Sequence, residues 1–76
     1  MKRALSPEAR RREIAKLERL ITEKEAELEE MRELRFEPEY YQDYQKMNDL
    51  DQDIDDIHNE LAHLEERWAS LLEEAA

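Results

Sequence analysis

The sequence contains no glycine, no cysteine and only two prolines. The absence of cysteine excludes disulfide scaffolds and zinc sites built on thiolates, and it is compatible with a reducing compartment. No apolar run approaches the roughly 18 residues that a membrane helix needs, and the first residues show no signal-peptide pattern. We therefore expect a cytoplasmic protein that does not contact a membrane.

Charged residues are abundant, and the two signs are unevenly distributed. They make up 45% of the chain, and the net charge is -10. Residues 1–19 hold seven basic and three acidic side chains, a balance of +4, whereas the remainder holds five basic and nineteen acidic ones, a balance of −14. Because the acidic part repels phosphate, only the first end is expected to contact ribosomal RNA or DNA. The candidate contact residues are Lys2, Arg3, Arg10, Arg11, Arg12, Lys16 and Arg19.

The first half of the chain has the periodicity of an amphipathic helix. Ser6, Pro7 and Glu8 form a helix start, with a hydroxyl cap, a proline at the first helical position and an acid in the first turn. The pattern predicts a helix over about 7–34. Lys24 is the one polar residue at a position where this series predicts an apolar one. The apolar residues of this series are Ile14, Leu17, Ile21, Leu28 and Met31.

The second half has a cleaner series, in which steps of three and four alternate without a miss. This is the heptad signature of a coiled-coil seam, and it predicts a helix over about 44–74. The predicted seam residues are Met47, Leu50, Ile54, Ile57, Leu61, Leu64, Trp68 and Leu71. Because Trp68 is in phase with this series, we expect it to fill the core rather than bind a ligand.

The segment between the two predicted helices contains a helix-breaking proline. Pro38 disfavours helix at the residue before it, so the first helix should end near Leu34, and Asp43 can cap the restart. Residues 37–42 are expected to form one 3₁₀-like turn, and the rings of Tyr40 and Tyr41 are expected to pack in this turn. A connection this short makes the helices antiparallel neighbours.

The predicted fold is therefore all-α, a two-helix antiparallel intramolecular coiled coil with a turn that contains proline and tyrosine. Residues 1–6 are expected to be the end of a basic linker, and residues 7–76 the hairpin domain. The expected register has facing residue numbers that add to about 78. It places Lys24 opposite Ile54 and Trp68 beside Arg10.

Two motifs resemble metal sites, but both fit a helical surface better. Residues 49–60 have acids at the spacing of a calcium loop, yet Ile54 stands where that loop needs glycine, and the heptad phase continues through the segment. Glu60 and His63 resemble half of a di-iron motif that has no second copy here. The sequence also lacks a Ser/His/Asp triad and a Gly-rich phosphate loop. We expect no catalytic residue, no metal and no cofactor in this chain.

Three segments together resemble the C-terminal coiled-coil domain of bacterial ABC-F ATPases, over about residues 5–74. The first is the opening Leu5-Ser6-Pro7-Glu8, which is followed by basic residues. The second is the turn and restart Glu37-Pro38-Glu39-Tyr40-Tyr41-Gln42-Asp43-Tyr44, and the third is the late Trp68-Ala69-Ser70-Leu71. This chain has Glu37 where the family commonly has aspartate, and an acidic second helix where nucleic-acid-binding members have basic residues.

The resemblance implies a non-catalytic accessory domain of a larger ABC protein. The parent would hydrolyse ATP with magnesium in two cassettes that lie outside these residues, lack membrane spans and act at the ribosome. Its ATPase domains would be partners of this chain, and the basic start would assist contact with nucleic acid. The alternative is a purely structural spacer or dimerisation module that self-associates and does not bind nucleic acid.

Overall fold

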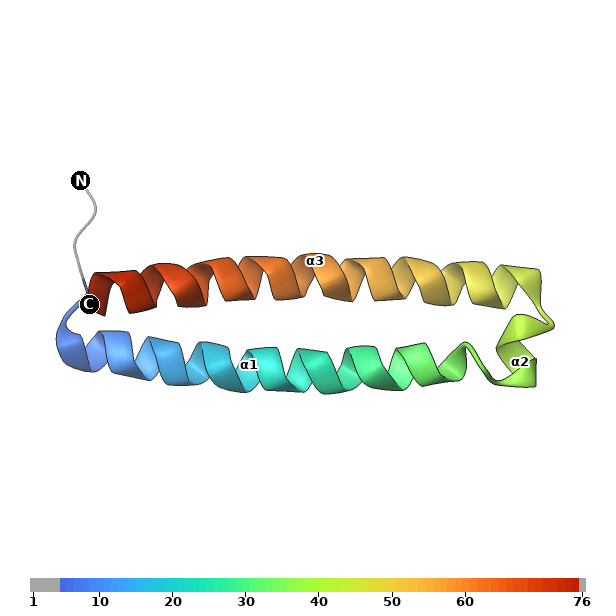
Figure 1. The fold of residues 1–76 in the computed structure, drawn as a ribbon, viewed down its shortest axis with the longest axis horizontal. Coiled ribbons are helices and arrows are strands. Elements are labelled where there is room, and N and C mark those ends of the chain that lie inside the picture. Colours follow the sequence, from blue (N-terminus) through green and yellow to red (C-terminus); the bar gives the residue numbers. More distant parts are fainter. Residues whose placement is uncertain (1–4, 76) are drawn as a thin grey trace.

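The structure is a computed structural model, and it describes residues 5–75 (Figure 1). The described chain forms α1 (Pro7–Leu34), α2 (Pro38–Tyr41) and α3 (Tyr44–Ala75). The two long helices lie side by side, and the chain reverses direction at α2, so α1 begins and α3 ends at the same end of the molecule (Figure 1). The two long helices that the sequence predicts are confirmed, and their bounds agree to within one residue.

Both predicted helix starts are capped as the sequence indicates. The Ser6 hydroxyl accepts a hydrogen bond of 3.2 Å from the backbone N–H of Ala9, and Pro7 opens α1. The Asp43 carboxylate accepts one of 3.1 Å from the backbone N–H of Lys46. These side chains satisfy amides that have no partner inside the helix, and they fix where each helix begins.

The connection between the long helices differs from the predicted 3₁₀-like turn. Tyr41 N donates to Glu37 O at 3.1 Å, and Gln42 N donates to Pro38 O at 3.0 Å, so α2 is one α-helical turn. Tyr40 packs against the core, as expected. Tyr41 is 56% exposed, because neighbouring helical residues point about 100° apart and only one of the two rings can face the core.

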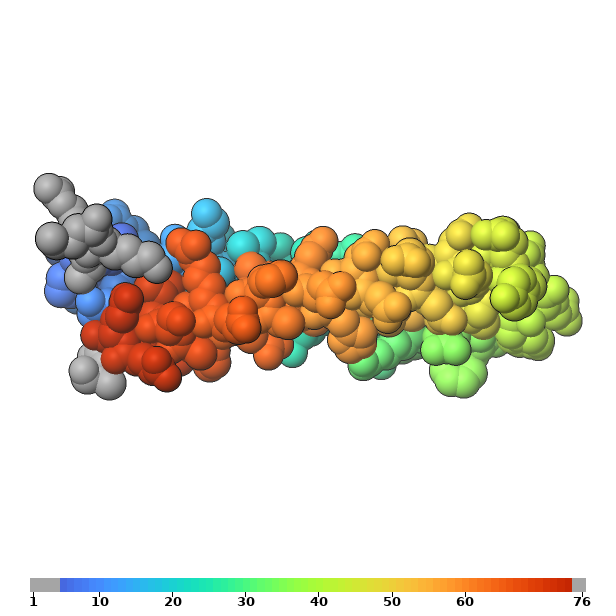
Figure 2. All heavy atoms as spheres, turned by 90° about the horizontal axis from the view of Figure 1, so that it is seen from above, coloured from blue at the N-terminus to red at the C-terminus, as the bar shows by residue number. Residues whose placement is uncertain are grey.

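The core is a single layer of side chains between α1 and α3. All thirteen predicted seam residues are buried or half-buried, and a contiguous cluster forms toward the turn. Its buried members are Leu28, Leu50, Ile54, Ile57 and Leu61. Figure 2, a view from above, shows that the molecule is a narrow rod, so a core of this kind cannot be thicker than one layer.

The register differs from the predicted one. Lys24 Nζ lies 2.7 Å from Glu60 Oε2, and Trp68 Nε1 donates to Glu18 Oε2 at 3.3 Å. The facing residue numbers therefore add to 84 and 86 rather than 78. The predicted placements of Lys24 opposite Ile54 and of Trp68 beside Arg10 are both wrong.

The reason for the shift is the position of α2. This turn packs against the first part of α3, where Leu34, Tyr40 and Leu50 line one groove. The turn α2 therefore occupies the place beside the first residues of α3. As a result, the end of α1 lies opposite a later residue of α3 than it would if the chain reversed directly after α1. The shift is close to seven residues, which returns the same heptad positions to the seam. A hydrophobic pattern alone cannot distinguish two registers that differ by one heptad.

Candidate functional site

Three of the predicted contact residues form a row on α1. Arg12, Lys16 and Arg19 are spaced by four and three residues, which places them on one face of the helix. All three are exposed, and none of them forms an ion pair within residues 5–75. We call this row the basic stripe. Arg11 is exposed beside it, whereas Lys2 and Arg3 lie outside the described residues.

Arg10 lies apart from the basic stripe. Its side chain is half-buried, and its Nη2 donates to the backbone carbonyl of Leu5 at 3.4 Å. Its Nε is buried and has no hydrogen-bond partner among the residues that the structure describes. The guanidinium is therefore used to hold the segment that precedes α1, and of the predicted contact residues it is the least accessible among those described.

Two acids on α1 near the basic stripe contact α3. Glu13 Oε1 lies 3.3 Å from Arg67 Nη2, and Glu18 accepts the indole N–H of Trp68. Both carboxylates are engaged across the helix pair, and neither forms an ion pair with Arg12, Lys16 or Arg19. The sequence cannot reveal this sorting of charges, because it depends on the register between the helices.

The five lysine and arginine residues from Lys24 onward contrast with the stripe because carboxylates or an imidazole engage them. The pKa of Lys24 is raised above its usual value, chiefly by its hydrogen bond to Glu60, and Glu27 at 3.6 Å adds to the effect. The pKa of Lys46 is raised by its 2.6 Å hydrogen bond to Glu39. Similar contacts join Arg35 to Asp51, Arg32 to His58 and Arg67 to Glu13.

The end of α3 limits the size of the basic surface. Residues 64–75 hold four acidic side chains and one arginine, a balance of −3, and they lie at the same end of the rod as residues 7–19, whose balance is +2. The candidate contact surface is therefore the narrow stripe on α1 rather than the whole end. This restriction is not visible from the linear charge distribution.

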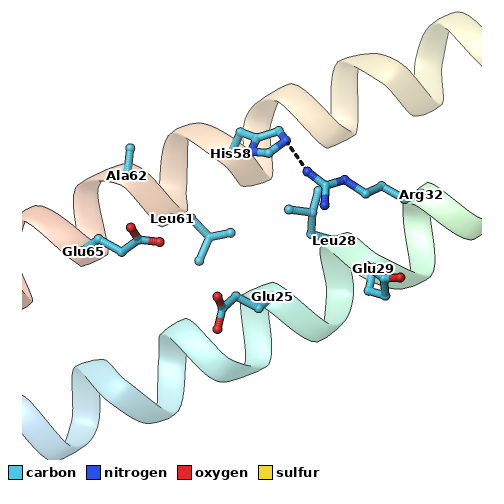
Figure 3. Close-up of a pocket in the computed structure, with 8 residues that line it drawn as sticks. All are labelled: Glu25, Leu28, Glu29, Arg32, His58, Leu61, Ala62 and Glu65. Atoms are coloured by element: carbon cyan, nitrogen blue, oxygen red, sulfur yellow. Dashed lines mark hydrogen bonds between the residues drawn. The ribbon is translucent and has the colours of Figure 1, made fainter.

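The groove between α1 and α3 is lined by charged side chains and by two leucines. Arg32 Nη2 lies 3.2 Å from His58 Nε2, and Leu28 and Leu61 line the same groove (Figure 3). An arginine can only donate, so this contact requires the neutral imidazole as acceptor. Within residues 5–75, no three histidine, aspartate or glutamate side chains gather to hold a metal ion. The two motifs that resemble metal sites stay helical, as their heptad phase predicts.

A second surface lies at the turn, and we call it the aromatic tip. It consists of Phe36, Tyr41 and Tyr44, which are 82%, 56% and 87% exposed. Phe36 lines a groove with Arg32, Arg35 and Met47. The sequence places these rings near the turn, but it gives no sign that they stay outside the core.

The extent of the hairpin agrees with a known domain family. A family model described as the ABC transporter C-terminal domain matches residues 7–73, which cover α1, α2 and nearly all of α3. The chain belongs to this family. No curated protein and no solved structure matches it.

Across residues 5–75, no helix combines the length and the apolar character needed to cross a membrane.

Proposed function

We propose that this chain is the non-catalytic C-terminal accessory domain of a cytoplasmic ABC-F ATPase, and that its basic stripe contacts nucleic acid, with ribosomal RNA as the expected target. The hairpin would serve as an antiparallel coiled coil that carries this stripe. The observation that carries the proposal is the exposure of Arg12, Lys16 and Arg19 on one helical face without an ion pair in the described chain.

The subfamily assignment rests on the turn and on the late tryptophan. The family match establishes an ABC transporter C-terminal domain, and the turn around Pro38 and Tyr40 together with Trp68 supports the ABC-F subfamily. In such a parent, ATP and magnesium would bind to the cassettes, and this chain would supply contacts only.

The charges make this contact an auxiliary one. Three phosphate contacts give a slope of about −2.7 in a plot of log K against log salt for duplex DNA, and about −2 for single strands. The net charge of -10 opposes binding at every salt concentration. We therefore expect weak binding by the isolated domain, which strengthens when a parent holds the stripe against a polyanion.

The test is a titration of labelled duplex DNA and of a structured RNA hairpin at several salt concentrations. The triple variant Arg12→Gln/Lys16→Gln/Arg19→Gln should lose most of the affinity, and its salt slope should be smaller by about one for each cation removed. The matched control is Lys24→Gln/Arg35→Gln/Lys46→Gln, which removes the same charge from side chains that are already paired. It should bind nearly as the unaltered chain does.

Two outcomes would contradict the proposal. One is equal loss of binding in the stripe variant and in the paired control, which would show an effect of net charge alone. The other is no salt-dependent binding of the unaltered chain at high protein concentration. The rival function, a spacer or dimerisation module, predicts that second outcome together with self-association in a sedimentation series.

A further inference from the structure

The aromatic tip exposes rings that the fold does not use. Tyr44 opens α3 and is 87% exposed, and Tyr41 is 56% exposed at the end of α2. Large aromatic side chains are usually at least half-buried, because each carries a large apolar area. Rings left in water at the turn of a two-helix rod therefore call for a partner.

The same turn shows how such rings receive a cation. Lys46 Nζ lies 5.8 Å from the centroid of the Tyr40 ring and 2.6 Å from Glu39 Oε1. The ammonium is thus held between an aromatic face and a carboxylate, which is the geometry of a cation–π contact. Around Tyr41 and Tyr44 the chain carries two further carboxylates, that of Glu37, which lies one helical turn before Tyr41, and that of Asp43, which precedes Tyr44 and caps α3.

We propose that Tyr41 and Tyr44, together with the carboxylates around them, bind an arginine-rich segment of a partner protein. Arginine fits better than lysine, because a planar guanidinium stacks on a tyrosine ring and pairs with a carboxylate at the same time. This interaction is independent of the proposed nucleic-acid contact, which uses the opposite end of α1.

The charge of the turn selects the class of partner. Residues 32–51 hold six acidic and three basic side chains, a balance of −3. Of the three basic ones, Arg35 is paired with Asp51, and Lys46 with Glu39. A phosphate backbone would be repelled by this surface, whereas a cationic peptide would be attracted.

A second copy of this chain is a poor occupant of the tip. Its own basic segment, residues 1–19, carries a balance of only +4, since Glu8, Glu13 and Glu18 lie among the cations. Residues 7–19 of that segment are also helical, which fixes the spacing of their cations. An extended arginine-rich segment from another protein can place a guanidinium on each ring in turn.

The experiment measures oligoarginine and oligolysine peptides against the full chain by calorimetry, with amide chemical shifts to locate the contact. Oligoarginine should bind more tightly than oligolysine, and the shifts should concentrate in residues 37–47. Tyr44→Ala should weaken oligoarginine binding about two- to fivefold, the size expected for an exposed cation–π contact. Tyr41→Ala should have a similar effect.

The matched control is Phe36→Ala, because Phe36 is 82% exposed but lies in a groove with Arg32 and Arg35. It should leave the affinity unchanged. A charge control compares Glu33→Gln/Glu37→Gln at the tip with Glu73→Gln/Glu74→Gln at the far end of α3, and only the first pair should weaken binding.

Three results would overturn the inference. Equal weakening by Tyr44→Ala and Phe36→Ala, or by the two charge variants, would show unspecific attraction of a cationic peptide. Binding of single-stranded nucleic acid that Tyr44→Ala abolishes would assign the rings to base stacking. A dimer in sedimentation that Tyr44→Ala dissolves would assign the tip to a second copy of this chain.

Discussion

The two ends of the rod are built on different principles. Toward the turn, five buried aliphatic residues form one continuous cluster, and nearly every cation there is engaged by a neighbouring side chain. Toward the start of α1, the buried residues are the isolated Leu17 and Leu71, and Arg12, Lys16 and Arg19 remain exposed. The comparison teaches that one end supplies most of the stability of the hairpin, whereas the other presents charge at the expense of packing.

The largest expected effect comes from the cluster. Ile57 is 4% exposed and lies at its centre, so Ile57→Ala should lower the free energy of unfolding by about 2–5 kcal/mol through lost burial and a cavity. Leu71→Ala, at the other end, should cost less, because helix ends fray and fewer side chains surround the site. Urea unfolding followed by circular dichroism measures both. Equal losses would remove the contrast between the two ends.

A stabilising change is expected where the apolar series on α1 is interrupted. Lys24→Leu fills that position with an apolar side chain and removes the ion pairs with Glu60 and Glu27. The added burial should outweigh this loss, because exposed ion pairs contribute little to stability. The melting temperature should rise by several degrees. Lys46→Leu, which lies outside the apolar series, is the control and should produce no gain. If Lys24→Leu melts at a lower temperature, then the ion pairs matter more than burial.

A smaller effect is expected at Trp68, which ties the looser end together. Trp68→Phe keeps an aromatic ring but removes the donor to Glu18, and it should cost about 0.5–1.5 kcal/mol. Amide exchange should accelerate chiefly in residues 7–20 and 64–75, with little change in the cluster. Glu18→Gln, which keeps an oxygen acceptor, should have a weaker effect. A uniform acceleration along the rod would show that both ends unfold as one unit.

The smallest effect is expected at alkaline pH. The hydrogen bond and ion pair with Glu60 raise the pKa of Lys24. The stability that charged Lys24 adds to the folded state is therefore fully present below the ordinary lysine pKa of about 10.4, and it is lost as the pH rises through the raised pKa. Unfolding midpoints of the unaltered chain should therefore decline above about pH 10 relative to those of Lys24→Met. A difference that stays constant across this range would contradict the assignment.

The sequence was sufficient for features that depend on nearby residues. Ser6 and Pro7 define the start of α1, Pro38 ends it, and Asp43 restarts the chain as α3, because capping and proline geometry act within one helical turn. The heptad series also placed all thirteen seam residues where the structure buries or half-buries them.

Features that depend on the pairing of the helices could not be predicted. The heptad repeat looks the same after a shift of seven residues, so the sequence could not tell whether Lys24 lies opposite Ile54 or near Glu60. The hydrogen bond from Trp68 to Glu18 depends on the same register. The exposure of Tyr44 likewise depends on how α2 fits beneath α3.

The arrangement of the helix ends has a mechanical consequence. Because α1 begins and α3 ends at one end of a rod whose longest extent is 52 Å, any protein joined to those ends would hold the hairpin by its base (Figure 1). A rotation at the base then displaces the turn by an amount proportional to the length of the rod. Tyr41 and Tyr44 would travel furthest, while the row of cations near the base would move least. The hairpin is thus shaped as a lever.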